Sequence, residues 1–199
     1  MTEENREQAQ AHWWNIANII TMIRIAMVPF FVAALLVEDS VAWRIAALVI
    51  FLVASLTDKL DGHLARSRGL ITDLGKILDP IADKVLTGAA LVVLSLLGEL
   101  PWWVTIVILG REAAITLMRF IVIRYVVLPA SRGGKIKTVT QIAAISAWLL
   151  PLSILPGAVT VIAWILMIAA VVVTVYTGLD YMVQGLRVFR AGQRDGDSK

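Results

Sequence analysis

The 199-residue sequence contains no cysteine. This absence excludes disulfide bridges, thiolate catalysis and metal sites with cysteine ligands. Charge is scarce, because Asp, Glu, Lys and Arg together make up only 17% of the residues. Residues 1–12 also lack the basic start of a secretory signal, since they contain three glutamates and a single arginine. We therefore expect no cleavable signal peptide.

Apolar residues, in contrast, are abundant. They account for 59% of the chain, whereas about 45–50% is usual for a soluble domain. Long apolar runs with few charges recur along the chain and are typical of transmembrane helices. No alternating strand pattern of the kind found in membrane barrels is present, and backbone groups in lipid must be paired internally. The sequence therefore predicts an all-α, polytopic membrane protein.

The apolar runs divide the chain into one membrane domain and two short ends. Residues 1–15 are predicted to form an N-terminal interfacial segment, because paired tryptophans close a polar stretch. Residues 16–186 are predicted to form a six-helix transmembrane domain, and residues 187–199 a polar C-terminal tail. The six spans are expected at about 16–37, from about 41 to Asp58, and at about 75–98, 101–128, 138–155 and 157–185.

The basic residues indicate how these spans are oriented. The linker between spans two and three contains Arg66, Arg68 and Lys76, and the linker between spans four and five contains Arg132, Lys135 and Lys137. The linkers on the opposite side contain no Lys or Arg. Because basic linkers stay in the cytosol, we expect both of these linkers and both termini to be cytosolic.

Five aspartates crowd the segment TDKLDGHLARSRGLITDLGKILDPIADKV, from Thr57 to Val85. Asp58 and Asp61 are three residues apart, and Asp79 and Asp83 are four apart, so each pair shares one face of its helix. Four poorly solvated carboxylates would repel one another unless a cation neutralised them. Oxygen ligands suit Mg²⁺, with Mn²⁺ as the alternative, and four carboxylates can hold two metals for phosphoryl transfer. Asp73 breaks this pattern and is predicted to lie solvated in the linker.

Small residues and one arginine accompany the aspartates. Gly62 and Ala65 flank Asp61, and small residues let a ligand or a neighbouring helix approach the backbone. Arg66 follows about one helical turn after Gly62, where a guanidinium can hold a phosphate. An ion-paired network that braces two helices is the structural alternative. Charged residues inside membrane spans are more often functional, so we favour the metal site.

The segment reads D-x2-D-G-x2-A-R-x8-G-x3-D-x3-D and resembles the signature of the CDP-alcohol phosphatidyltransferases. The resemblance implies six membrane helices and a site open to the cytosol. It also implies transfer of a phosphatidyl group from a CDP-linked lipid to an alcohol, with release of CMP. By motif position, it implies that the four paired aspartates are metal ligands and that Asp83 is also the general base. It further implies contacts to the CDP-lipid from Asn18, Thr21, Gly62, Arg66 and Thr72.

A second group of basic residues bears on the acceptor alcohol. The stretch GREAAITLMRF contains Arg111 and Arg119, eight residues apart and so on nearly one helix face. Lys135 and Lys137 follow in SRGGKIKTVTQ. Such a concentration of cations favours a phosphate-bearing acceptor over serine or free inositol. For the lysines, the alternative is contact with anionic headgroups; for Arg111, it is a buried pair with Glu112 or another carboxylate.

Three stretches, NIITMIRIAMVPFF, GREAAITLMR and GKIKTVTQ, resemble the branch of the family that uses sn-glycerol 3-phosphate and makes phosphatidylglycerophosphate. This resemblance implies CDP-diacylglycerol and glycerol 3-phosphate as substrates. It assigns the acceptor phosphate to Arg111, Arg119, Lys135 and Lys137. The rival acceptors within the family are inositol phosphate and phosphatidylglycerol, the latter giving cardiolipin.

A divalent-cation transporter is the alternative from another class, and it predicts acids near the middle of the bilayer. Asp58 instead comes about 17 residues, or roughly 25 Å, into its helix. This depth places the cluster near the cytosolic edge and favours the enzyme. The family resemblance implies a homodimer in a bacterial cell membrane, and we expect no nucleic-acid partner.

Overall fold

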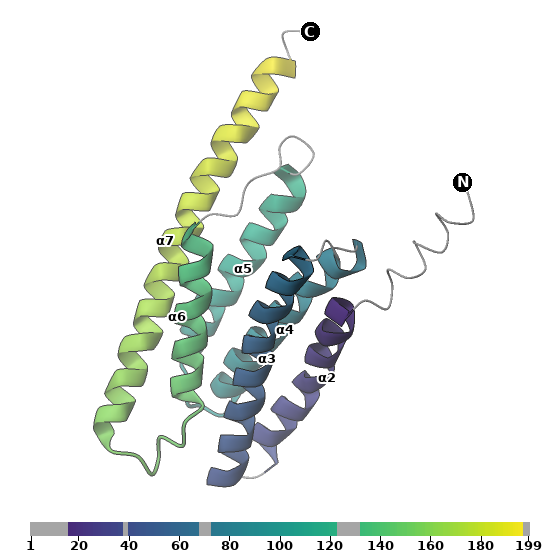
Figure 1. Ribbon diagram of the computed structural model, residues 1–199. Coiled ribbons are helices and arrows are strands. Elements are labelled where there is room, and N and C mark those ends of the chain that lie inside the picture. Colours follow the sequence, from purple (N-terminus) through teal and green to yellow (C-terminus); the bar gives the residue numbers. More distant parts are fainter. Residues whose placement is uncertain (1–15, 38–39, 68–72, 123–131, 197–199) are drawn as a thin grey trace, which may run out of the picture. The chain divides into compact units, whose positions relative to one another are not determined.

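The computed structural model of this protein describes residues 16–37, 40–67, 73–122 and 132–196. Within the helices, the side chains of residues 16–18, 58–81, 83, 119–122, 132–133, 135 and 185–196 fall outside the description. The described residues form helices and turns without a strand (Figure 1). The helices are α2 (Ile16–Leu36), α3 (Val41–Ser67), α4 (Asp73–Leu96), α5 (Trp102–Val122), α6 (Arg132–Trp148) and α7 (Gly157–Gly196). The predicted all-α class is confirmed for this part of the chain.

Two stretches of helix are long and apolar enough to cross a membrane by themselves. They are Ile19–Leu36 in α2 and Gly157–Gln184 in α7. The 28 residues of the second stretch would span roughly 42 Å, more than the ~30 Å of a bilayer core. The apolar stretches Val41–Thr57 and Lys84–Leu96 are shorter. The structure thus supports a membrane protein, while the number of crossings stays a prediction.

The described chain divides into two compact units. The first contains α2, α3 and α4 as far as Val93, together with Trp148–Ile154. The second contains α5, most of α6, and α7, together with the turn that begins at Leu94.

Packing of α2 against α3 builds the first unit. Phe31 and Phe51 are fully buried, and their ring centroids lie 5.9 Å apart with the planes tilted by 39°. Alanines at 34, 47 and 54 are also buried along the two helices. Because small residues let helix backbones approach closely, the alanines and the ring pair together account for the fit of α2 on α3.

Arg44 caps the C-terminal end of α6 with a hydrogen bond. The Arg44 guanidinium donates a hydrogen bond from Nη2 to the Trp148 carbonyl, at 3.2 Å. Trp148 is the last residue of α6, and the final carbonyls of a helix have no partner within it. A cation there also complements the helix dipole. Arg44 therefore supplies a cap that tertiary structure brings to α6.

The second unit starts with a tight turn between α4 and α5. Gly98 has φ of 74°, a left-handed conformation that glycine adopts without steric cost. The amides of Glu99 and Leu100 donate to the Leu94 carbonyl at 3.0 and 3.1 Å. The hydroxyls of Ser95 and Thr105 lie 2.7 Å apart in a buried hydrogen bond. The end of α4 is thereby tied to the first turn of α5.

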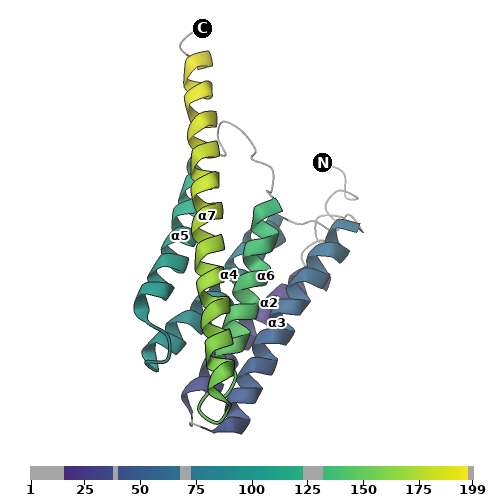
Figure 2. The same ribbon diagram turned by 90° about the vertical axis from the view of Figure 1, so that its left-hand side faces the viewer.

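Within the second unit, α5 and α7 pack against each other. Helix α6 lies beside α7 in both views (Figures 1 and 2) and is joined to it by a hydrogen bond from Gln141 to Thr174. The apolar core of this unit includes Val104, Ile108, Ile145 and Met167, each at most 1% exposed.

The predicted fifth span, at about 138–155, begins inside the observed helix and is wrong at its far end. Helix α6 begins at Arg132 and ends at Trp148. Its early end has a local cause, because Pro151 disfavours helical backbone in the residue before it and cannot itself continue a helix. Its early start runs through Gly133 and Gly134 despite their poor helix propensity. Arg132, Lys135 and Lys137 consequently lie on α6 and not in a linker.

Two further elements differ from the sequence-based expectation. Asp73, predicted to lie in the linker, is the first residue of α4, where a carboxylate favours the positive end of the helix dipole. Helix α7 continues to Gly196, so most of the polar tail predicted at 187–199 is helical. The segment up to Gly196 contains no proline that would end the helix earlier.

Candidate active site

The two aspartate pairs lie on continuous helical backbone. Asp58 and Asp61 belong to α3, and Asp79 and Asp83 belong to α4, both within the first unit. Separations of three and four residues on an α-helix place the members of each pair on one face. The side chains of all four aspartates lie outside the described part of the structure, so their role as metal ligands stays a prediction. Among the described side chains, no cluster of three or more acidic or histidine residues is placed to hold a metal.

The residues predicted to contact the CDP-lipid fall in the same unit. Gly62 and Arg66 lie on α3 and Asn18 on α2, with side-chain positions outside the description. Thr72 lies outside the described residues.

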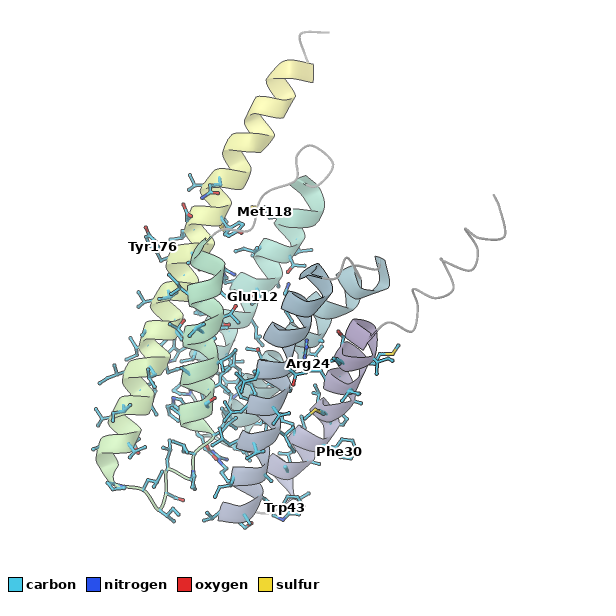
Figure 3. All side chains as sticks on the ribbon, in the orientation of Figure 1. Arg24, Phe30, Trp43, Glu112, Met118 and Tyr176 are labelled. Atoms are coloured by element: carbon cyan, nitrogen blue, oxygen red, sulfur yellow. The ribbon has the colours of Figure 1, made fainter. Side chains whose placement is uncertain are left out.

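Thr21, the fifth predicted CDP-lipid contact, is described in full. It is 1% exposed and takes part in a polar interaction. Arg24, labelled in Figure 3, lies one helical turn further along α2, is 2% exposed and also interacts with a partner. A buried charge is costly unless it is paired or hydrogen-bonded. The buried face of α2 therefore contains a polar site within an otherwise apolar helix, and Thr21 belongs to it.

Of the residues predicted to bind the acceptor, Arg111 on α5 has the most hydrogen bonds in the described structure. Its Nε donates to the Thr174 carbonyl at 3.1 Å, and its Nη2 donates to Thr177 Oγ1 at 3.0 Å. Its Nη1 donates to Glu112 Oε1 at 2.9 Å. Three separate nitrogen atoms are thus engaged, which fixes the plane of the guanidinium group.

Lys137 on α6 reaches the same carboxylate. Its Nζ lies 2.5 Å from Glu112 Oε1, the oxygen that also accepts from Arg111. The three side chains are largely buried, with 11% of Arg111, 11% of Lys137 and 15% of Glu112 exposed. The predicted buried pair of Arg111 with Glu112 is therefore present, and the structure adds Lys137 to it. Figure 3 marks Glu112 on α5.

A layer of uncharged groups supports this cluster from α6 and α7. Gln141 Nε2 donates to Thr174 Oγ1 at 2.9 Å, and the Thr177 hydroxyl donates to the Val173 carbonyl at 2.7 Å. Arg111 crosses α7 at Gly178, where an added Cβ would lie 2.8 Å from Arg111 Cγ and 3.0 Å from Nε. Only glycine leaves room for the arginine at this crossing.

The charges of the cluster do not balance. Arg111 and Lys137 contribute two positive charges and Glu112 one negative charge. Within the described residues, three of the five N–H groups of Arg111 and one of the three of Lys137 have a partner. The arrangement can therefore bind an anion with N–H donors that its internal bonds leave available.

The other two predicted acceptor residues are placed only by their backbone. Arg119 lies on α5 and Lys135 on α6, with side chains outside the description. The structure thus brings Arg111 and Lys137 together and leaves the contribution of the other two as a prediction.

Sequence reasoning offered the pair of Arg111 with Glu112 but missed the bond from Lys137 to Glu112 and the parts played by Gln141, Thr174 and Thr177. A usable signal was present for the two threonines: they interrupt the apolar run VVVTVYT and lie three apart, just before Gly178. Polar residues at this spacing on an apolar helix indicate a polar face. The pairing of Glu112 with Lys137, across 25 residues, has no local sequence signal.

The chain thus combines apolar helices, an aspartate motif on α3 and α4, and a buried cationic cluster on α5 and α6. A family model described as CDP-alcohol phosphatidyltransferase matches residues 14–176. The match includes both aspartate pairs, Arg111 and Lys137. The chain belongs to the CDP-alcohol phosphatidyltransferase family.

Individual members of the family are similar to this chain over most of its length. The chain is 50% identical over 175 residues to a protein of Mycobacterium tuberculosis (strain CDC 1551 / Oshkosh) named probable phosphatidylglycerophosphate synthase, covering 87% of this chain and 82% of that one. It is 40% identical over 149 residues to the CDP-diacylglycerol–glycerol-3-phosphate 3-phosphatidyltransferase of Bacillus subtilis (strain 168), covering 69% and 77%. A Rickettsia felis protein with the same name is 36% identical over 137 residues, covering 68% and 75%.

Proposed function

We propose that this protein transfers the phosphatidyl group of CDP-diacylglycerol to sn-glycerol 3-phosphate, giving phosphatidylglycerophosphate and CMP. The names of three relatives at 36–50% identity support this substrate pair. The structural observation that carries the proposal is the buried cluster of Arg111 and Lys137 on Glu112. Its excess positive charge suits an acceptor that bears a phosphate and does not suit a neutral or zwitterionic alcohol.

The acceptor phosphate is proposed to bind at this cluster. Arg111 offers N–H groups in a fixed plane, and Lys137 offers a compact ammonium group beside it. Arg119 and Lys135, on the same two helices, are proposed to add charge around the phosphate. Binding the acceptor by its phosphate orients its free hydroxyl groups for reaction.

The aspartates are proposed to hold two Mg²⁺ ions, or Mn²⁺ in their place, with Asp58, Asp61, Asp79 and Asp83 as ligands. Their helical register supports this assignment, since each pair shares a face of α3 or α4. Carboxylate oxygens are the ligands that these cations prefer. When bound, such metals supply charge neutralisation for the pyrophosphate of the donor.

The CDP-lipid is proposed to bind beside the aspartates. Arg66 and Gly62 lie on α3, where the arginine would contact the pyrophosphate and the glycine would let the nucleotide approach the backbone. Asn18, Thr21 and Thr72 are proposed to contact the cytidine end. The buried polar face of α2 at Thr21 supports a role for this helix in binding a polar group.

In the reaction, a hydroxyl oxygen of glycerol 3-phosphate attacks the phosphorus that carries diacylglycerol. The new bond joins that oxygen to phosphorus, and the bond between phosphorus and the bridging oxygen of the pyrophosphate breaks. CMP leaves with the bridging oxygen. Asp83 accepts the hydroxyl proton, which makes the attacking oxygen a better nucleophile.

The protein is proposed to span a bacterial cell membrane six times, with the site and both termini in the cytosol, and to form a homodimer. The positions of the basic residues support this orientation. A site at the cytosolic edge lets water-soluble glycerol 3-phosphate and CMP exchange while the lipid substrate enters from the bilayer.

The test of this function is CMP release by the purified protein with CDP-diacylglycerol and Mg²⁺. Glycerol 3-phosphate, inositol phosphate, phosphatidylglycerol and serine are offered in turn. We expect release with glycerol 3-phosphate, its loss with EDTA, its recovery with added Mg²⁺, and its loss in Asp83→Asn. Release with inositol phosphate or phosphatidylglycerol alone would move the protein to another branch of the family. Metal binding without release would favour the transporter.

A further inference from the structure

Glu112 occupies an unusual place in the cationic cluster, because one of its oxygens accepts from both cations. Arg111 Nη1 lies 2.9 Å and Lys137 Nζ 2.5 Å from Glu112 Oε1. Arg111 and Glu112 are neighbours on α5, whereas Lys137 comes from α6. A single carboxylate oxygen therefore sets the separation between a guanidinium on one helix and an ammonium on another.

Stability alone is a poor explanation for this arrangement. Buried ion pairs often contribute little net stability, because removing the charges from water offsets their attraction. Here one of the two cations lacks a matching negative charge within the group, and all three side chains are at most 15% exposed. A buried excess of positive charge is unfavourable until an anion binds to it. The cluster is therefore better suited to receiving an anion than to stabilising the fold.

The two cations depend on Glu112 to different degrees. Arg111 is also held by the Thr174 carbonyl and the Thr177 hydroxyl. The ammonium group of Lys137 has Glu112 as its one hydrogen-bond partner among the described residues. Lysine is a flexible chain that loses much rotamer freedom when fixed. Removal of the Glu112 charge would consequently release Lys137 more than Arg111.

We infer that Glu112 is a positioning residue that holds Lys137 beside Arg111 so that the two cations can bind the acceptor phosphate together. This inference rests on the proposed function and deepens it. Glu112 acts through Lys137 and does not itself contact the acceptor, because its own charge would repel the phosphate.

A double-mutant cycle tests this dependence. The KM for glycerol 3-phosphate and kcat are measured for wild type, Glu112→Gln, Lys137→Gln and the double variant. We expect each single change to raise the KM for glycerol 3-phosphate about 10-fold or more, which is a loss of ~1.4 kcal/mol of acceptor binding free energy. The value of kcat should change less than about 3-fold. The double variant should be no worse than Lys137→Gln alone by more than about 3-fold, because the two residues act as one unit.

The cycle distinguishes the positioning of Lys137 by Glu112 from a mere effect of the cluster's net charge. The double variant removes one positive and one negative group, so its local charge equals that of the wild type. If local charge alone set acceptor binding, Glu112→Gln would lower KM and the double variant would match the wild type. Either result would overturn the inference, as would an unchanged KM in Glu112→Gln when Lys137→Gln raises it.

Matched variants guard against a merely structural effect. Asp180→Asn removes a carboxylate from an exposed site on α7, where it accepts from Gln184, and should leave KM unchanged. Glu112→Asp keeps the charge but is one methylene shorter, so it should raise the KM for glycerol 3-phosphate although the net charge is preserved. The KM for CDP-diacylglycerol should stay constant throughout. A parallel rise in both KM values would show a general disturbance and overturn the assignment.

Results that contradict the proposed function can be distinguished from results that contradict the role of Glu112. If the wild type released CMP with another phosphate-bearing acceptor, the same cycle on that acceptor would decide the role of Glu112. Turnover with serine and with no phosphate-bearing acceptor would overturn both ideas. If no acceptor supported turnover, calorimetric binding of glycerol 3-phosphate would still decide, and equal affinity in wild type and Glu112→Gln would overturn the inference.

Discussion

The crossing of Arg111 over Gly178 gives a sharp structural prediction for Gly178→Ala. The added Cβ would lie 2.8 Å from Arg111 Cγ and 3.0 Å from Nε. The contact falls on a side chain, so the helices can stay in place while Arg111 moves. Relief to an ordinary van der Waals contact requires a shift of roughly 0.6 Å or more. Arg111 cannot make this shift and keep its present hydrogen bonds to α7.

The expected loss of stability in Gly178→Ala follows from the hydrogen bonds that would be weakened. Arg111 donates at 3.1 Å to the Thr174 carbonyl and at 3.0 Å to the Thr177 hydroxyl, so a shift of this size would weaken both. Hydrogen bonds to charged groups contribute about 1.5–3 kcal/mol each to stability. Replacing glycine by alanine within a helix stabilises it by about 1 kcal/mol, which offsets part of the loss. We expect a net loss of about 1–3 kcal/mol of stability. The KM for glycerol 3-phosphate should rise about 10-fold, because the displaced guanidinium no longer meets the phosphate.

The assay combines thermal unfolding in detergent with steady-state kinetics. For a loss of about 2 kcal/mol, the apparent Tm should fall by about 4–8 °C. Gly110→Ala is the matched control: Gly110 precedes Arg111 on α5, and an added Cβ there meets nothing within 4 Å. That variant should keep its KM and gain slight stability. Equal Tm and equal KM in the two variants would refute the account of the Arg111 crossing.

Two further substitutions test the cluster and the first unit. Arg111→Lys keeps the charge, but one ammonium group cannot reach the three partners that the guanidinium spans, so the KM for glycerol 3-phosphate should rise about 10-fold with the KM for CDP-diacylglycerol unchanged. An unchanged acceptor KM would argue against the fixed guanidinium plane. Phe31→Ala should lower stability by about 3 kcal/mol, because Phe31 is fully buried against Phe51. Phe30→Ala, at a neighbouring site that is 69% exposed, should change the unfolding temperature little, and equal effects would contradict the packing of α2 on α3.

Local patterns predicted much of the helical framework. The apolar runs placed α2 at 16–37 and α7 at 157–185, and the structure has Ile16–Leu36 and Gly157–Gly196. The predicted spans at 75–98 and 101–128 also left a turn between α4 and α5, where Gly98 adopts positive φ. These features depend on residues close in sequence, so the sequence is enough to find them.

Features that depend on distant partners were not predictable in the same way. Gly133 and Gly134 have poor helix propensity, yet α6 begins before them. Lys137, a few residues further on, pairs with Glu112 across 25 residues of chain. Tertiary contacts of this kind override local propensity.

The candidate site also contains features that local spacing predicts and features that depend on distant partners. The aspartate motif was predictable, because its register on a helix follows from spacing alone. The partners of Arg111 on α7 lie 63 and 66 residues away, and no spacing rule connects them. The cations and the pair of Arg111 with Glu112 were therefore predictable, while the bond from Lys137 to Glu112 and the two threonines on α7 were not.

The most direct test of the central claim is incorporation of labelled glycerol 3-phosphate into lipid by the purified protein. Wild type, Asp79→Asn and Lys137→Gln are compared with CDP-diacylglycerol and Mg²⁺ at two acceptor concentrations. We predict labelled phosphatidylglycerophosphate and an equal amount of CMP from the wild type, almost none from Asp79→Asn, and recovery of Lys137→Gln at the higher concentration. Labelled lipid from Asp79→Asn at the wild-type rate, or none from the wild type, would contradict the account.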